Sequence, residues 1–182
     1  ITLGIVNVAD SLIARETDCG VYLNAGREFA VASTKSFTSQ CIALSLISIW
    51  FAQNKNLYYK TRVKKIKDIM KFHYQISYLL KDKSNKFEKL YYKFKKYSSV
   101  FLLGKGQNES IAKEGSLKIK EVTYLHAEGY SSSALKHGPF ALIQKGLPII
   151  IIDTDEKHRD KTLNAVFETL TRDAELFIIT NK

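Results

Sequence analysis

Three charged residues with helical spacing are the strongest indication of chemistry in this sequence of 182 residues. Glu114 and Lys118 are four residues apart, and Glu121 follows Lys118 by three, so both carboxylates can reach the ammonium group along one side of a helix. The set holds one carboxylate more than the ammonium can neutralise. Such a carboxylate is a candidate for shuttling protons, because its pKa responds to its neighbours. The alternative is a purely structural set of ion pairs that joins this helix to another.

The side of the helix that these charges occupy can be predicted from a rotation of about 100° per residue. We expect a helix from about residue 109 to 125, in which Lys113, Ser116 and Lys120 form the solvent-facing side. The three charged residues fall on the opposite side, among the apolar residues Ile111, Leu117, Ile119, Val122 and Leu125. A charge against an apolar wall is costly unless it is paired. The pattern therefore predicts a paired triad on the buried side of the helix.

Two further segments could bind or transform a ligand. His137 precedes Gly138-Pro139, a bend that could hold the imidazole outside regular structure; catalysis and a plain surface position both fit this pattern. The segment AVASTK, residues 30–35, places backbone N–H groups at a helix start, where phosphate can bind. Ser33 or Thr34 could equally be an ordinary N-cap.

The elements that must position these residues alternate between short apolar strands and helices. We expect strands at 2–8, 19–23, 98–106, 147–153 and 175–180, and helices at 34–53, 58–80, 84–96, 109–125 and 159–172. The strands are continuous Ile, Leu and Val runs, and the 34–53 helix is apolar around most of its circumference, so we expect all of these to be buried. The pattern predicts an α/β fold with parallel sheets flanked by helices. We divide the chain into parts at 1–57 and 88–182, joined by a helical connector at 58–87.

The net charge of +10 is concentrated in one segment. Residues 55–97 hold 14 Lys and Arg against three acidic residues, with Tyr and Phe interleaved. This could indicate nucleic-acid binding, but no DNA- or RNA-reading motif is present, and lysine-rich solvated helix faces explain the pattern better.

The sequence argues against a metal-binding protein and against a membrane-spanning one. Cys19 and Cys41 lie in apolar runs without metal-ligand spacing, so we expect reduced interior thiols, no metal site and a cytoplasmic setting. The longest apolar segment, residues 41–52, is too short to span a membrane.

The chain starts with ITLGIVNVAD, without Met or a basic leader, and both ends fall beside strands. We therefore expect a fragment of a larger protein.

Two long motifs resemble the glutamine–fructose-6-phosphate aminotransferase (isomerizing) family. They are RETDCGVYLNAGREFAVASTKSFTSQ at 15–40 and EGSLKIKEVTYLHAEGYSSSALKHGPFALI at 114–143. They resemble its isomerase half, which is built from two sugar isomerase (SIS) domains, and the resemblance extends over essentially the whole chain. It implies synthesis of glucosamine 6-phosphate from fructose 6-phosphate and glutamine, without a cofactor, as a step of hexosamine biosynthesis.

The resemblance also implies roles for particular residues. Glu121 would move a proton between C1 and C2 of the sugar, Lys118 would assist at the C1 hydroxyl, and His137 of a neighbouring subunit would open the sugar ring. Val31 and Ser33 would contact the sugar phosphate. A homodimer and an upstream glutaminase domain are implied as well, while Glu114 is expected to have a supporting role.

The chain departs from the family pattern in several places. Ser133-Ala134 stands where the family has Gly-Glu, so one acidic side chain near His137 is lost. The phosphate-binding loops, the C-terminal lysine that forms an imine with the sugar, and the glutaminase nucleophile lie outside the sequence, so we expect no activity from this chain alone. Two alternatives stay open. One is another double-SIS enzyme, a deglycase or deaminase acting on phosphorylated amino sugars, and the other is a non-catalytic sugar-phosphate sensor.

Overall fold

The computed structural model describes residues 1–81 and 86–181, which fall into two compact units divided near residue 84. Helix α3, Tyr59–Lys81, belongs to the first unit, and α4, Lys86–Phe94, belongs to the second. The predicted separate connector at 58–87 stays a prediction, and its residues 82–85 lie outside the described residues.

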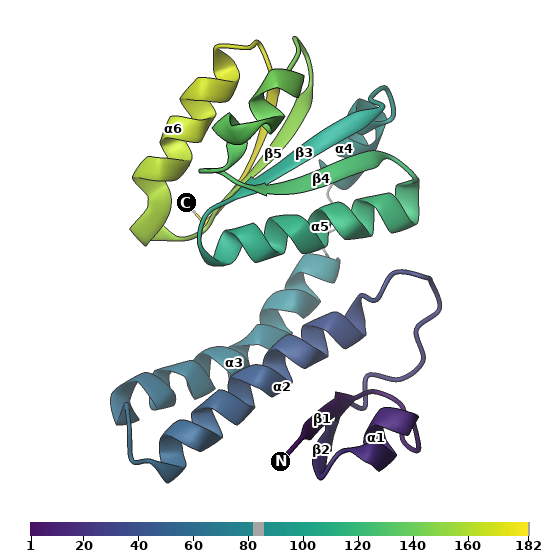
Figure 1. Ribbon diagram of the computed structural model, residues 1–182, viewed down its shortest axis with the longest axis vertical. Coiled ribbons are helices and arrows are strands. Elements are labelled where there is room, and N and C mark those ends of the chain that lie inside the picture. Colours follow the sequence, from purple (N-terminus) through teal and green to yellow (C-terminus); the bar gives the residue numbers. More distant parts are fainter. Residues whose placement is uncertain (82–85, 182) are drawn as a thin grey trace. The chain divides into compact units, whose positions relative to one another are not determined.

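The second unit is a four-stranded parallel sheet in the order β4-β3-β5-β6, with helices on both faces (Figure 1). After α4, its elements in chain order are β3 Ser99–Gly104, α5 Gln107–Thr123, β4 His126–Ser131, the short 3-10 helices η1 Leu135–His137 and η2 Pro139–Leu142, β5 Pro148–Asp153, η3 Glu156–His158, α6 Arg159–Leu170 and β6 Glu175–Thr180. Strand β3 is central because it pairs with both β4 and β5. The predicted α/β fold with parallel strands flanked by helices is confirmed.

The two faces of this sheet carry separate apolar clusters. On one face Leu102 of β3 packs with Ala112 of α5. On the other face Phe101 and Leu103 pack with Leu135 of η1. This division follows from the strand period, since successive side chains of β3 point to opposite faces. As a result, α5 and η1 lie on opposite sides of the same sheet.

Helix α5 lies unusually close to the sheet because small residues line the contact. A side chain at Gly129 of β4 would place its Cβ 2.5 Å from Lys113 Cα, and one at Gly104 would place it 2.0 Å from the Asn108 carbonyl oxygen. Ala112 and Ser116 face the sheet from the helix and are buried. The small residues therefore fix which side of α5 turns towards the sheet.

Strand β4 is a strand of the second unit that the sequence pattern did not predict. Its sequence HAEGYS lacks an apolar run, because Ala127 and Gly129 are the residues that face α5. Close contact with the helix, rather than side-chain hydrophobicity, makes this segment an edge strand. The remaining predicted strands and helices of the second unit are present with slightly different ends.

The first unit contains a two-stranded parallel sheet and two long helices. Its elements are β1 Leu3–Val6, α1 Leu12–Glu16, β2 Cys19–Tyr22, α2 Lys35–Asn54 and α3 Tyr59–Lys81. The expectation that its strands and the first long helix are buried is wrong for β2 and for most of α2, whereas β1 is buried at Gly4 and Val6. All of β2 is exposed, and Ser36 and Ala43 are the buried residues of α2. Several of the apolar side chains that led to the prediction, among them Val21, Leu46 and Trp50, are exposed in the described residues of this unit.

Candidate functional site

Glu114, Lys118 and Glu121 form the predicted triad on α5. The Lys118 ammonium donates a hydrogen bond to Glu121 Oε2 at 2.7 Å, and its Nζ lies 3.4 Å from Glu114 Oε1. Each of the three side chains is about a quarter exposed, at 24–26%. The ion pairs predicted from the sequence spacing are thus confirmed, because one ammonium lies between two carboxylates.

The ion pairs change the proton affinity of Lys118. Its pKa is raised above the ordinary lysine value, chiefly by the hydrogen bond to Glu121. Burial, the second-largest effect, acts in the opposite direction, and the charge of Glu121 and the contact with Glu114 add to the rise. Lys118 therefore stays an ammonium at neutral pH and provides a fixed positive charge beside Glu121.

The side of α5 that carries the triad was predicted to be buried, but the opposite side is the one that packs against the sheet. Ser116, expected in solvent, is 3% exposed and packs towards the sheet, whereas Ile111 and Leu117 are exposed and Val122 is 62% exposed. The small residues at the helix–sheet contact explain this difference, because only they fit against β3 and β4. The triad shares one side of α5 with Ile111, Leu117 and Val122, and that side faces away from the sheet of this unit. Ile119 and Leu125, which were predicted on the same side, pack against the sheet.

His137 lies at the end of η1 and is exposed. Leu135 of the same short helix is fully buried against Phe101 and Leu103, on the face of the sheet opposite α5. The sheet therefore lies between His137 and the Lys118–Glu121 pair of the same unit. The structure does not bring these three predicted residues together within one copy of the second unit.

Val31 and Ser33 belong to the first unit, in the segment that leads into α2. Val31 is 88% exposed, and Ser33 is half-buried. The helix start that follows already holds an anionic group, because Glu28 accepts hydrogen bonds from the backbone N–H groups of Ser36 at 2.9 Å and Thr34 at 3.2 Å.

Glu28 takes the capping role that was predicted for Ser33 or Thr34. Thr34 occupies the N-cap position without a capping side-chain hydrogen bond. The pKa of Glu28 is lowered, first by the hydrogen bond from the Ser36 backbone. A carboxylate near a helix N-terminus is stabilised in this way. Sequence reasoning missed this role, and an acidic residue shortly before the STK segment was the available signal.

A second network that the sequence did not indicate surrounds His126. Its Nδ1 lies 2.9 Å from Ser99 Oγ and its Nε2 lies 3.4 Å from Glu128 Oε1, while the Tyr130 hydroxyl donates to Glu128. His126 is exposed and lies on an edge strand. We interpret these contacts as links between the starts of β3 and β4.

The two cysteines do not lie where the sequence pattern predicted them. Cys19 and Cys41, expected in the interior, are both exposed, because β2 and the side of α2 that carries Cys41 are uncovered. Within residues 1–81 and 86–181 no group of three or more His, Cys, Asp and Glu side chains could hold a metal ion. In the same residues no helix is long and apolar enough to cross a membrane.

The sequence matches the family described as "SIS domain" over residues 1–49 and 93–182. The chain belongs to the SIS domain family.

Three known proteins with related names are similar to this chain over nearly its whole length. A protein of Acanthamoeba polyphaga mimivirus, named a probable glutamine–fructose-6-phosphate aminotransferase [isomerizing], is 45% identical over 184 residues, covering 100% of this chain and 30% of the relative. The enzyme of that name from Encephalitozoon cuniculi is 40% identical over 178 residues, covering 97% and 25%. The solved C-terminal domain of glucosamine-fructose-6-phosphate aminotransferase from Francisella tularensis superposes with a TM-score of 0.91 at 35% identity, covering 98% of this chain and 50% of that one. The resemblance stated from the motifs is confirmed, and the chain spans less than a third of these curated relatives.

Proposed function

We propose that this chain forms the isomerase part of a glutamine–fructose-6-phosphate aminotransferase, an enzyme of amino-sugar synthesis. The complete enzyme would make glucosamine 6-phosphate and glutamate from fructose 6-phosphate and glutamine, using ammonia released by a glutaminase region. The observation that carries the proposal is the 2.7 Å contact between Lys118 and Glu121 on α5, in a chain that is 45% identical to a relative of that name.

The Lys118–Glu121 pair has the chemistry that this isomerisation needs. In the proposed reaction the Glu121 carboxylate accepts a proton from C1 of the open-chain sugar and returns it to C2. The Lys118 ammonium, kept charged by its raised pKa, stabilises the negative charge that develops at the C1 oxygen. Glu114, at 3.4 Å from the same ammonium, has the supporting role of holding Lys118 in place.

The proposed site requires two copies of the chain. His137 opens the sugar ring in this account, but the sheet separates it from Glu121 of its own unit. His137 would therefore serve the Lys118–Glu121 pair of a neighbouring copy, in a cytoplasmic homodimer. Ser133 and Ala134 leave His137 without an acidic neighbour at these two positions, so its imidazole would work without that carboxylate.

The sugar phosphate would be held in part by the first unit. Val31 and Ser33 would contact it, with Val31 contributing through its backbone because its side chain is apolar. Glu28 already accepts hydrogen bonds from the N–H groups of Thr34 and Ser36 at the start of α2. The proposed phosphate contacts are therefore those of residues 31–33, ahead of the helix.

The alternatives of a deglycase, a deaminase or a sugar-phosphate sensor have no observation in their favour. Both curated relatives described above carry the aminotransferase name. Ser133-Ala134, the departure that made a sensor conceivable, leaves Lys118 and Glu121 unchanged.

The test follows the exchange of the C1 proton of fructose 6-phosphate with deuterated water, in an enzyme assembled from this chain and the remaining regions of its relatives. Glu121→Gln should lower the exchange rate by about 100-fold or more while the sugar phosphate still binds. Glu109→Gln is the matched control, because Glu109 forms an equivalent 2.7 Å ion pair with Lys113 on the same helix. Exchange at the wild-type rate in Glu121→Gln would show that the assignment is wrong.

A further inference from the structure

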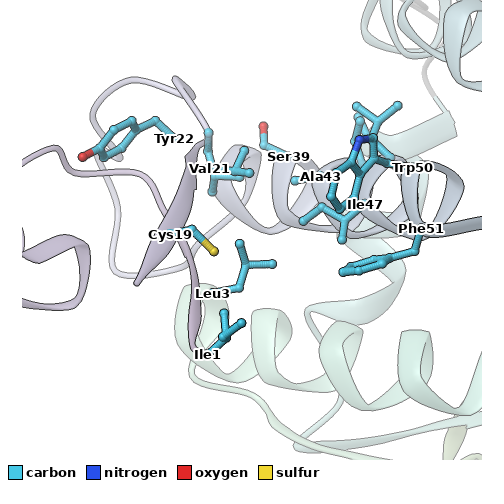
Figure 2. A pocket seen from close by; sticks show the side chains of 13 residues that line it. Ile1, Leu3, Cys19, Val21, Tyr22, Ser39, Ala43, Ile47, Trp50 and Phe51 are labelled. Atoms are coloured by element: carbon cyan, nitrogen blue, oxygen red, sulfur yellow. The ribbon is translucent and has the colours of Figure 1, made fainter. Parts of the chain in front are cut away.

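Helix α3 carries most of the positive charge of the first unit. Its sequence holds seven Lys and Arg against one acidic residue, Asp68. Helix α2, which packs against it, has Lys35 as its only charged residue, and its Trp50 and Phe51 border an uncharged hollow (Figure 2). The family match stops at residue 49 and resumes at residue 93, so it leaves out α3. The charge of α3 is thus a feature of this chain for which the SIS match does not account.

Four lysines share one side of α3. They follow one another at intervals of four, three and four residues and are Lys60, Lys64, Lys67 and Lys71. At a rotation of 100° per residue this spacing forms a single stripe, with a lysine every ~4.5–6 Å along the helix axis. All four side chains are exposed, and the lysines that form ion pairs in residues 1–81 and 86–181 are others, Lys93 among them. The charges of this lysine stripe are therefore open to a partner.

Two tyrosines continue the lysine stripe towards the end of α3. Tyr74 follows Lys71 by three residues and Tyr78 follows Tyr74 by four, so both fall on the same side of the helix as the lysines. Tyr74 is 69% exposed and Tyr78 is 80% exposed. Both rings are therefore open to solvent rather than part of a core. The basic segment is more than a solvated face, because it combines aligned charges with open rings.

The apolar residues of α3 favour a partner in solution over a lipid surface. A helix that lies in a membrane surface buries an exposed apolar face in the lipid and turns its lysines towards water. In α3 the apolar residues Ile69, Phe72 and Ile76 lie roughly opposite the lysine stripe and are already partly buried, and α3 packs against α2. The lysines and the two rings share the exposed side instead. Proteins that bind single-stranded nucleic acid combine positive charge and open aromatic rings in this way.

We propose that the lysine stripe of α3, together with Tyr74 and Tyr78, binds single-stranded nucleic acid. The lysines neutralise successive backbone phosphates, and the two rings stack on unpaired bases. Both contacts are independent of base sequence, in agreement with a sequence that contains no DNA- or RNA-reading motif. The proposal concerns a binding surface of the first unit and does not rest on the proposed isomerase activity.

The test measures binding of a fluorescently labelled oligouridylate by anisotropy, with an enzyme assembled from this chain and the remaining regions of its relatives. The stripe variant replaces all four lysines by glutamine, which is neutral and also favours a helix. Its substitutions are Lys60→Gln, Lys64→Gln, Lys67→Gln and Lys71→Gln. Each phosphate contact with a single strand contributes about −0.7 to the slope of log affinity against log salt, so the variant should bind about 10-fold or more weakly and show a shallower slope. Tyr74→Ala and Tyr78→Ala should each weaken binding by about fivefold or more.

The matched control removes the same charge from four exposed lysines of the second unit. Its substitutions are Lys120→Gln, Lys145→Gln, Lys157→Gln and Lys161→Gln. It should bind the oligouridylate nearly as tightly as the wild type, and circular dichroism should show the same helix content in all variants.

Three results would overturn the proposal. The first is no binding of the oligouridylate by the wild type. The second is an equal loss of affinity in the control and in the stripe variant, because net charge alone would then explain binding. The third is a preference of the wild type for phosphatidylserine vesicles or for polyglutamate, because a lipid surface or an acidic protein segment would then be the partner.

Discussion

Lys118 and Glu121 face each other across one turn of α5, with Nζ 2.7 Å from Oε2. Glu114 approaches the same ammonium from the preceding turn at 3.4 Å. Because two carboxylates share one ammonium, the proton affinity of Lys118 reports directly on both contacts. This makes the geometry of the triad testable without any measurement of activity.

The first prediction concerns the pKa of Lys118. NMR titration of a chain with labelled lysine should place it above the ordinary lysine value, and Glu121→Gln should move it back further than Glu114→Gln, because the hydrogen bond to Glu121 is the largest cause. A larger return with Glu114→Gln would contradict the observed geometry.

The sign of this shift also predicts a dependence of stability on pH. A pKa raised by folding means that the ion pairs stabilise the fold fully below the unfolded-state pKa, and that this contribution is lost as pH rises through the folded-state pKa. Above about pH 10.4, the ordinary lysine pKa, the free energy of unfolding should therefore fall more steeply for the wild type than for Lys118→Met. Denaturant unfolding of both proteins between pH 8 and 12 measures the difference.

The cap that Glu28 provides for α2 gives an independent prediction. Glu28→Ala should lower the melting temperature, since two backbone N–H groups lose their acceptor. The pKa of Glu28 is lowered by folding, so its contribution is present above the unfolded-state pKa and is lost as pH falls through the folded-state value. The difference between variant and wild type should therefore shrink in acid. Glu16→Ala, which removes an exposed carboxylate from α1, is the control and should change the melting temperature little.

The close contact between α5 and β4 predicts a cost for a single methyl group. Gly129→Ala would place Cβ 2.5 Å from Lys113 Cα, and the resulting displacement of the helix should cost about 1–3 kcal/mol of the free energy of unfolding. Gly115→Ala is the control, because its methyl group would meet the flexible end of the Leu102 side chain at 3.0 Å. Equal effects of the two substitutions in urea denaturation would argue against a rigid contact at Gly129.

Some features of the site follow from local sequence, and others do not. The contacts of Lys118 with Glu114 and Glu121 could be predicted, because i, i+3 and i, i+4 spacing acts within one helix. The buried side of α5 could not be predicted from hydrophobicity, because the contact with the sheet selects Ala112 and Ser116 for their size. Ile111, Leu117 and Val122 lie on the outer side instead, so most of the side predicted to be buried faces away from the sheet.

Long-range relationships were the hardest to predict. Glu28 caps α2 from a loop, and no periodic pattern marks such a contact. Strand β4 is defined by its neighbours β3 and α5 rather than by its own residues. The position of His137 across the sheet from Glu121 depends on the topology β4-β3-β5-β6, which spacing along the chain does not reveal.

The central claim is that one active site takes Lys118 and Glu121 from one copy and His137 from another. The most direct test mixes two inactive enzymes, each assembled from this chain and the remaining regions of its relatives, one with Glu121→Gln and the other with His137→Ala. After subunit exchange, half of the dimers should be mixed, and each of these should contain one intact site and one doubly defective site. We predict recovery of about a quarter of the wild-type rate of glucosamine 6-phosphate formation. No recovery, with mixed dimers shown by native mass spectrometry, would contradict the two-copy site.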